Sequence, residues 1–174
     1  MTANTIVVAP LACLSAVASE WRPNDAVSLM SPGAHLAAID GVPPERHTIL
    51  RFNDIVEERA GLIAPNEEHA ERLVAAVAAW SGARPLLLHC WFGVSRSPAA
   101  AMIALAAHAP ALSAEHIADA LRDASPTATP NALMIAHADR LLGRNGALVA
   151  AAARIGRGRD VDGDVPAFSL RVPE

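Results

Sequence analysis

The chain has 174 residues, of which 52% are hydrophobic and 18% are charged, a composition typical of one globular domain with its own core. All 14 basic residues are arginine, and the formal net charge of −4 gives no general attraction to nucleic acid or to an anionic membrane. The two cysteines, Cys13 and Cys90, lie far apart in the sequence. This argues against a disulfide scaffold and favours a reducing compartment.

Short apolar runs bounded by turn residues predict four strands, and segments with helical periodicity predict six helices. In chain order the predicted strands are residues 5–9, 26–30, 48–52 and 85–89. The predicted helices are residues 11–21, 67–80, 99–108, 113–124, 131–142 and 147–155. Strands separated by helices indicate an α/β fold, with a central, mostly parallel sheet of four to five strands and helices on both sides.

We expect a single domain over residues 1–156 and a C-terminal tail over residues 157–174, packed on the domain or loosely attached to it. The tail is rich in glycine and aspartate, and Phe168 and Leu170 are the side chains that could attach it to the body. Residues 1–20 are apolar, but no basic residue precedes Arg22 and Pro10 interrupts the run, so a secretory signal is not expected. We therefore expect a cytoplasmic protein with no membrane contact.

The most informative stretch reads His-Cys-Trp-Phe-Gly-Val-Ser-Arg-Ser-Pro, over residues 89–98. It follows a buried strand and leads into a helix that opens at Pro98, where proline is tolerated. A strand that turns directly into a helix aims backbone N–H groups and the positive end of the helix dipole at one point, which suits a phosphate dianion. Cys90 would lie beneath that point as a thiolate nucleophile, and Arg96 would bind two phosphate oxygens.

A cysteine and an arginine at this spacing also arise by chance, and a free cysteine is often only a small buried hydrophobe. The neighbouring residues make the pattern more specific. The string His-Cys-x-x-Gly-x-Ser-Arg-Ser resembles the signature of the cysteine-dependent protein tyrosine and dual-specificity phosphatases. Residues 7–11 and 130–131 are, more loosely, similar to small bacterial tyrosine phosphatase-like proteins.

The resemblance implies a phosphate-binding loop formed by Trp91, Phe92, Gly93, Val94 and Ser95 together with Arg96. It also implies that the hydroxyl of Ser97 helps the thiolate to leave. The side chains of Trp91 and Phe92 either line the pocket or pack beneath it, and His89 orders the loop. The arginine and the amides take the place of a metal, so we expect neither a metal nor another cofactor.

The resemblance further implies a general acid on a loop that follows a strand and precedes a helix. Asp54 fits this position, and the loop after it is long enough to close over a substrate. Glu57 and Glu58 are the alternatives. Asn131 is expected to cap the following helix, with a place near the phosphate-binding loop as the other possibility.

These residues predict hydrolysis of phosphomonoesters on phosphotyrosine, with phosphoserine and phosphothreonine as further candidates, through a cysteinyl-phosphate intermediate. The expected partner is a phosphorylated protein or a small phosphomonoester, and not a nucleic acid. Two alternatives stay open: a pseudophosphatase that binds phosphorylated partners without turnover, and a redox or sulfur-transfer enzyme that uses Cys90. The sequence leaves the physiological substrate and the oligomeric state open.

Overall fold

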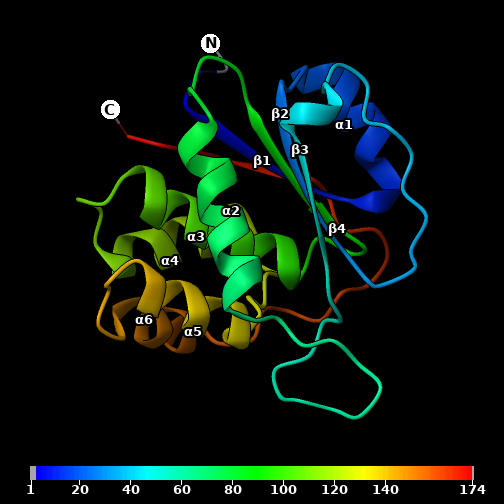
Figure 1. The fold of residues 1–174 in the computed structure, drawn as a ribbon. Coiled ribbons are helices and arrows are strands. Elements are labelled where there is room, and N and C mark those ends of the chain that lie inside the picture. The colour runs from blue at the N-terminus through cyan, green and yellow to red at the C-terminus, as the bar shows by residue number, and fades with distance from the viewer. Residues whose placement is uncertain (1–2, 174) are drawn as a thin grey trace.

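The structure is a computed structural model that describes residues 3–173. Its strands are β1 (Thr5–Pro10), β2 (Asp25–Met30), β3 (His47–Arg51), β4 (Leu86–Cys90) and β5 (Phe168–Arg171). Its helices are α1 (Leu14–Trp21), α2 (Glu67–Ala79), α3 (Arg96–His108), α4 (Ala114–Ala124), α5 (Ala132–Leu141) and α6 (Ala147–Ile155) (Figure 1). Two short 3₁₀ turns cover Leu11–Cys13 and Pro44–Arg46.

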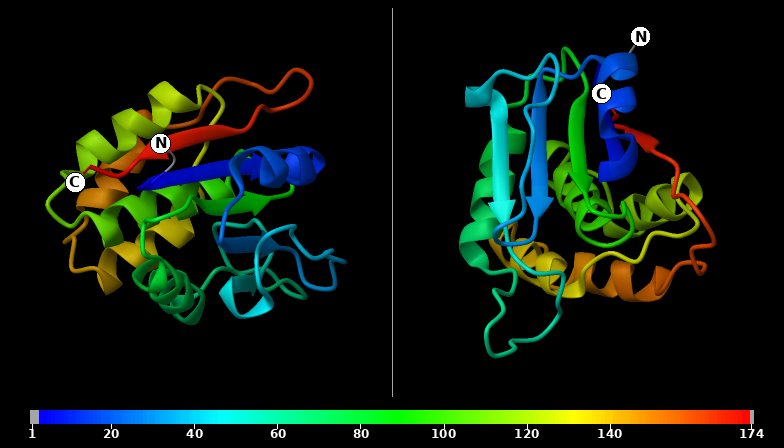
Figure 2. Two further views of the ribbon diagram at one scale, coloured as in Figure 1. Left: turned by 90° about the horizontal axis from the view of Figure 1, so that it is seen from above. Right: turned by 90° about the vertical axis from the view of Figure 1, so that its right-hand side faces the viewer.

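The strands form one five-stranded sheet in the order β3-β2-β4-β1-β5. The pairs β2–β3, β2–β4 and β1–β4 are parallel, and β5 runs antiparallel to β1 at the edge. This confirms the predicted mostly parallel sheet. The parallel strands all end at the same side of the molecule, where the loop that follows β3 projects (Figure 2, right). In open α/β sheets this is the side that binds ligands.

Helices cover both faces of the sheet, as predicted: α1 lies on one face and the other helices lie on the opposite face (Figures 1 and 2). Alternate residues of β1 follow this division. Val7 and Ala9 pack with residues of α1, whereas Ile6 and Val8 belong to the larger core beneath the remaining helices. Side chains that alternate along a strand point to opposite faces of its sheet, so both faces of β1 are apolar.

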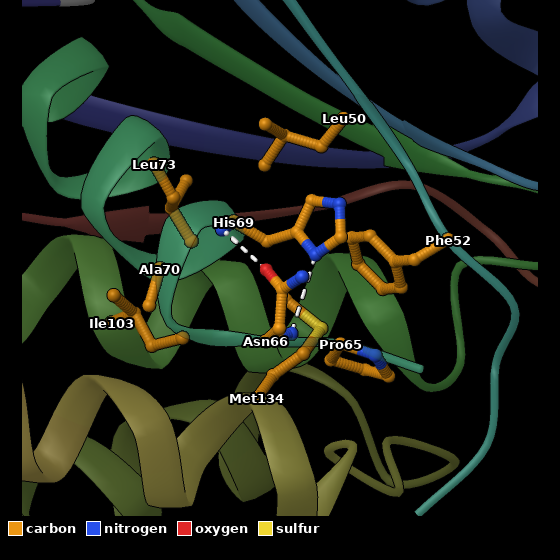
Figure 3. Close-up of a pocket in the computed structure, with 9 residues that line it drawn as sticks. All are labelled: Leu50, Phe52, Pro65, Asn66, His69, Ala70, Leu73, Ile103 and Met134. Atoms are coloured by element: carbon orange, nitrogen blue, oxygen red, sulfur yellow. Dashed lines mark hydrogen bonds between the residues drawn. The ribbon is translucent and has the colours of Figure 1, made fainter. Parts of the chain in front are cut away.

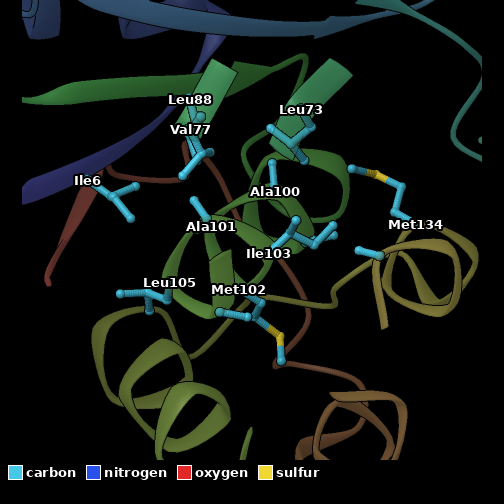
Figure 4. Packing of buried hydrophobic residues seen from close by; sticks show 14 of the residues in the cluster. Ile6, Leu73, Val77, Leu88, Ala100, Ala101, Met102, Ile103, Leu105 and Met134 are labelled. Atoms are coloured by element: carbon cyan, nitrogen blue, oxygen red, sulfur yellow. The ribbon is translucent and has the colours of Figure 1, made fainter. Parts of the chain in front are cut away.

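Helix α3 lies at the centre of the larger core (Figure 4). Every residue from Arg96 to Ala106 is buried, and alanine fills many of these positions. Small side chains let the sheet and the neighbouring helices approach α3 closely from all sides. The helix that starts at the candidate site is therefore held rigidly by the core.

The predicted boundaries differ from the structure in three places that matter. Helix α3 begins at Arg96 rather than near residue 99, so Pro98 occupies its first turn, where a missing N–H costs nothing. Strand β4 ends one residue later than predicted and includes Cys90. Strand β5 lies in the tail, where the sequence predicted no strand. In the described part of the chain, no helix is both long and apolar enough to cross a membrane.

Candidate active site

The segments that follow β1, β2, β3 and β4 meet at the carboxyl edge of the sheet. Two of them, the segments after β3 and β4, line an open pocket of about 420 Å³ there. Its lining residues are Asp54, Cys90, Phe92, Val94, Ser95, Arg96 and Val161. The pocket thus joins the loop between β4 and α3, the loop after β3, and one residue of the C-terminal tail.

The loop between β4 and α3 directs several of its carbonyl groups outward. Three of them accept hydrogen bonds from backbone N–H groups elsewhere: Trp91 from Leu11 (3.1 Å), Val94 from Thr129 (2.8 Å) and Ser95 from Asn131 (3.3 Å). The C=O and N–H of a trans peptide point in opposite directions, and the described chain has no cis peptide. The N–H groups of Phe92, Ser95 and Arg96 therefore point to the inner side of the loop, as an anion site requires.

Gly93 allows this loop to turn beside the end of β1. Its φ is +70°, a backbone conformation that residues with a side chain rarely adopt. A Cβ at this position would also lie 3.2 Å from the backbone nitrogen of Pro10. Both the backbone angle and the close approach therefore require glycine.

Cys90 lies at the bottom of the pocket, as the last residue of β4, and it is almost fully buried. Its Sγ lies 3.1 Å from the Oγ of Ser97 and accepts a hydrogen bond from the Gly93 N–H at 3.3 Å. Both the hydroxyl and the amide can donate to a sulfur anion. The N-terminus of α3, which begins six residues after Cys90, adds the positive end of its dipole.

Arg96 brings a buried guanidinium to the same pocket, with only 4% of the residue exposed. Its Nη1 donates to the Phe52 carbonyl at 3.1 Å and to the Ser31 Oγ at 3.4 Å. Its Nε has no hydrogen-bond partner among residues 3–173. The nearest carboxylate oxygen in an ion pair, Oδ2 of Asp54, is 3.9 Å from Nε, which is too long for a hydrogen bond.

Asp54 is held toward the loop by two donors. Its Oδ1 accepts from the Ser95 Oγ at 2.7 Å and from the Asn131 Nδ2 at 2.8 Å. The loop that carries Asp54 is closed at its base, because Asn53 N–H donates to the Ile63 carbonyl and Ile63 N–H donates to the Asn53 Oδ1. The carboxyl group therefore has a defined place, although the loop beyond it is exposed.

The two ends of the Asp54 loop are anchored around a cavity of about 10 Å³, which has room for no more than one water (Figure 3). Phe52, just after β3, packs against His69 of α2 with ring centroids 4.8 Å apart and the ring planes tilted by 49°. Asn66 caps α2 and exchanges two hydrogen bonds with His69. The pKa of His69 is lowered from its ordinary value, mainly by burial. Both ends of the loop are therefore fixed to the body of the protein.

Next to Cys90 on β4, the side chain of His89 is fully buried. The Ser28 Oγ lies 2.5 Å from Nε2 of His89 and 2.6 Å from Nε2 of His47. Burial lowers the pKa of His89 to about 4; His47 adds to this and the Cys90 backbone opposes it. A neutral imidazole that links β4 to Ser28 of β2 fits a role in ordering the end of β4, where the loop begins.

The structure brings Asp54, Cys90 and Arg96 to one pocket and places Ser97 against Cys90. The Trp91 side chain instead lines an adjoining groove, and its Nε1 donates to Ser31 at 3.3 Å. The alternative acids Glu57 and Glu58 are exposed and do not line the pocket. Among residues 3–173, no three His, Cys, Asp or Glu side chains gather as a metal site.

Four residues with a place at the site were missed or only partly recognised in the sequence. Ser31 and the Phe52 carbonyl hold Arg96, and Val161 of the tail lines the pocket. Asn131 caps α5, as expected, and also contacts Asp54. Only Asn131 had a sequence signal, its position before a helix.

No protein-family model matches the chain, and no curated protein sequence matches it. Solved structures share its fold. Human DUSP28 has a TM-score of 0.58 and 20% identity, over 82% of this chain and 94% of that one. The Yvh1 phosphatase domain from Chaetomium thermophilum has a TM-score of 0.56 and 18% identity, over 82% and 93%. Tk-PTP in its active form has a TM-score of 0.54 and 18% identity, over 82% and 97%. Similarity at these identities establishes the fold.

Proposed function

We propose that this protein hydrolyses phosphomonoesters on phosphotyrosine, with phosphoserine and phosphothreonine as further candidates, through a cysteinyl-phosphate intermediate. The observation that carries the proposal is the buried guanidinium of Arg96, whose Nε lacks a partner among the described residues, in the pocket that contains Cys90. A buried donor without a partner costs about 1–3 kcal/mol, and more when it is charged. A bound phosphate would offer that N–H an oxygen and would lie against the thiol.

In the first step, the thiolate of Cys90 attacks phosphorus, a P–S bond forms and the P–O bond to the leaving group breaks. Asp54 donates its proton to the departing oxygen. The inner N–H groups of the loop and Arg96 hold the other three phosphate oxygens as charge shifts onto them. In this structure Asp54 and Cys90 line the same pocket, which the proposed step requires.

In the second step, water attacks phosphorus, the P–S bond breaks and its electron pair returns to sulfur. Asp54, now a carboxylate, takes the proton from the water. The Ser97 hydroxyl lies 3.1 Å from Sγ and can donate to the departing thiolate. Inorganic phosphate then leaves, and the enzyme returns to its starting state.

The fold supports this proposal, since the structural neighbours include proteins whose names identify them as phosphatases. The proposed substrate is a phosphorylated protein or a small phosphomonoester. A working thiolate needs a reducing environment, so we propose the cytoplasm as the site of action. We also propose that the protein is a small bacterial tyrosine phosphatase-like protein, as the resemblance of residues 7–11 and 130–131 implies.

The test is the release of nitrophenol from p-nitrophenyl phosphate in the presence of a chelator. We expect turnover by the wild type, none by Cys90→Ser, and a loss on the order of 10²–10⁴ for Arg96→Lys, which lacks the planar fork. Full activity in Cys90→Ser would overturn the proposal. So would an inactive wild type that binds phosphopeptides tightly, which would favour a pseudophosphatase.

A series of aryl phosphates isolates the role of Asp54. Asp54→Asn removes the proton but keeps the size of the side chain, so the loss should be large for phenyl phosphate and small for esters of acidic phenols. Glu57→Gln is the matched control, because Glu57 is exposed on the same loop and does not line the pocket. If Asp54→Asn lost the same factor of activity for every ester in the series, Asp54 would not be the general acid.

A further inference from the structure

A second groove, of about 510 Å³, lies directly beside the candidate active site. Phe92 and Val161 line both spaces, so a ligand can extend from one into the other. The far side of the groove is formed by Leu11 and Cys13, which follow β1, and by Asp164 in the tail. The groove is thus continuous with the proposed phosphate site.

The wall between the two spaces is apolar and exposed. Phe92 is 75% exposed, and Trp91 and Val161 are also among the exposed large hydrophobic residues. The indole N–H of Trp91 donates to Ser31, which fixes the ring in the groove. Large exposed apolar side chains that gather beside a pocket indicate a surface that a ligand covers.

Asp164 is the single charged side chain in the lining of the groove. It is exposed, and among residues 3–173 it has no hydrogen bond or ion pair. Cys13 and Asp164 both line the groove. Burial is the main cause that raises the pKa of the Cys13 thiol, and the charge of Asp164 acts in the same direction. The groove therefore combines aromatic walls with one free negative charge.

We propose that this groove binds the arginine or lysine side chain of a phosphopeptide substrate, at a residue near the phosphorylated one; this rests on the proposed phosphatase function. The long apolar stem would cover Val161 and Leu11, as such stems commonly do. The cationic head would lie over Trp91 or Phe92 and pair with Asp164. A second phosphate does not fit, because no basic side chain lines the groove.

The test is a panel of phosphotyrosine peptides in which arginine, leucine or glutamate is placed in turn at each position from three before to three after the phosphotyrosine. We expect arginine at one position to raise kcat/KM about fivefold over leucine. Asp164→Asn should bring that ratio close to one, and Asp164→Arg should favour glutamate at the same position. Asp162→Asn is the matched control, because Asp162 belongs to the same segment but lies outside the groove.

Two results would overturn the inference while the proposed function stands. One is hydrolysis of p-nitrophenyl phosphate with no preference for arginine at any position. The other is an arginine preference that Asp162→Asn reduces as much as Asp164→Asn, since this would reflect the general negative charge of the chain. If the wild type hydrolyses neither the aryl phosphate nor any peptide, the proposed function and this inference both fail.

Discussion

Asn131 joins the cap of a helix to the proposed general acid. Its Oδ1 accepts from the Met134 N–H at 3.0 Å, and its Nδ2 donates to Oδ1 of Asp54 at 2.8 Å. The Asn131 N–H donates to the Ser95 carbonyl, and the Ser95 hydroxyl donates to Asp54. Asn131, Ser95 and Asp54 therefore form a closed set of contacts, in which the start of α5 holds both the loop that carries Asp54 and the loop between β4 and α3.

Replacing Asn131 by serine separates its two roles. Serine is a good N-cap, so the free energy of unfolding should fall by no more than about 1 kcal/mol. Serine is too short to reach Asp54, so kcat/KM for an aryl phosphate should fall about tenfold or more as the acid loses its position. The measurements are urea unfolding and steady-state kinetics on the same preparations.

The control for Asn131→Ser is Ser113→Ala, which removes the cap of α4 away from the pocket. This variant should lose about 1 kcal/mol of stability and keep its activity. If Asn131→Ser is as active as the wild type, Asn131 is only a helix cap.

Gly93→Ala should damage the proposed phosphate-binding loop for two reasons. The positive φ costs a residue with a Cβ about 1–2 kcal/mol, and the new Cβ would press on the Pro10 nitrogen at 3.2 Å. We expect a loss of stability and at least a tenfold loss of kcat/KM, with weaker inhibition by inorganic phosphate. Gly143→Ala separates the two causes, because Gly143 also has a positive φ but open space around it. It should lower stability by about 1–2 kcal/mol without changing the phosphate inhibition constant.

The pKa of His89 predicts how stability depends on pH. In the unfolded state the pKa of His89 has its ordinary value of 6.5, whereas burial lowers it to about 4 in the folded state. Between these values the unfolded state binds more protons, so stability is fully present above about pH 6.5 and falls as the pH is lowered toward 4, by up to about 3 kcal/mol. The pKa of His47 is also lowered, mainly by burial, and acts in the same direction.

Urea unfolding of the wild type and of His89→Gln at several pH values between about 7.5 and about 4.5 measures this slope. The variant should be less stable at neutral pH, because glutamine does not reproduce the packing and the hydrogen bond of His89 with Ser28. Its stability should nevertheless change less with pH. Parallel pH dependences in the two proteins would mean that other groups cause the loss in acid.

The sequence predicted the parts of the fold that depend on local patterns. Strands β1, β2 and β4 are nearly continuous apolar runs because both of their faces are buried, and such runs are visible in the sequence. The residues from Cys90 to Arg96 were found because the proposed phosphate-binding loop is one short, continuous segment. Strand β5 gave no such signal, since it is a four-residue edge strand in which Leu170 alone is buried.

The contacts that position the site come from distant segments, and this is why the sequence did not show them. The Phe52 carbonyl that accepts from Arg96 is a backbone group, and any residue carries one. Ser31 is the first residue of an ordinary turn after β2, and Val161 is in a polar tail. The sequence offered two alternatives for Asn131, a helix cap or a place near the Cys90–Arg96 loop, and the structure combines them, because its Oδ1 caps α5 while its Nδ2 donates to Asp54.

Ser97→Ala should slow the second chemical step more than the first. The Ser97 hydroxyl is fully buried and lies 3.1 Å from the Cys90 Sγ, where it can donate to the thiolate as the P–S bond breaks. Without that donor the phosphoenzyme should accumulate, so kcat should fall by about 10–100-fold and stopped-flow records should show a burst of nitrophenol close to one per enzyme. Ser95→Ala is the matched control, since its hydroxyl bonds to Asp54 and not to Cys90. It should slow the first step for poor leaving groups and give no burst. If Ser97→Ala slows turnover without a burst, the hydroxyl acts before the intermediate forms, and its assigned role in thiolate departure is wrong.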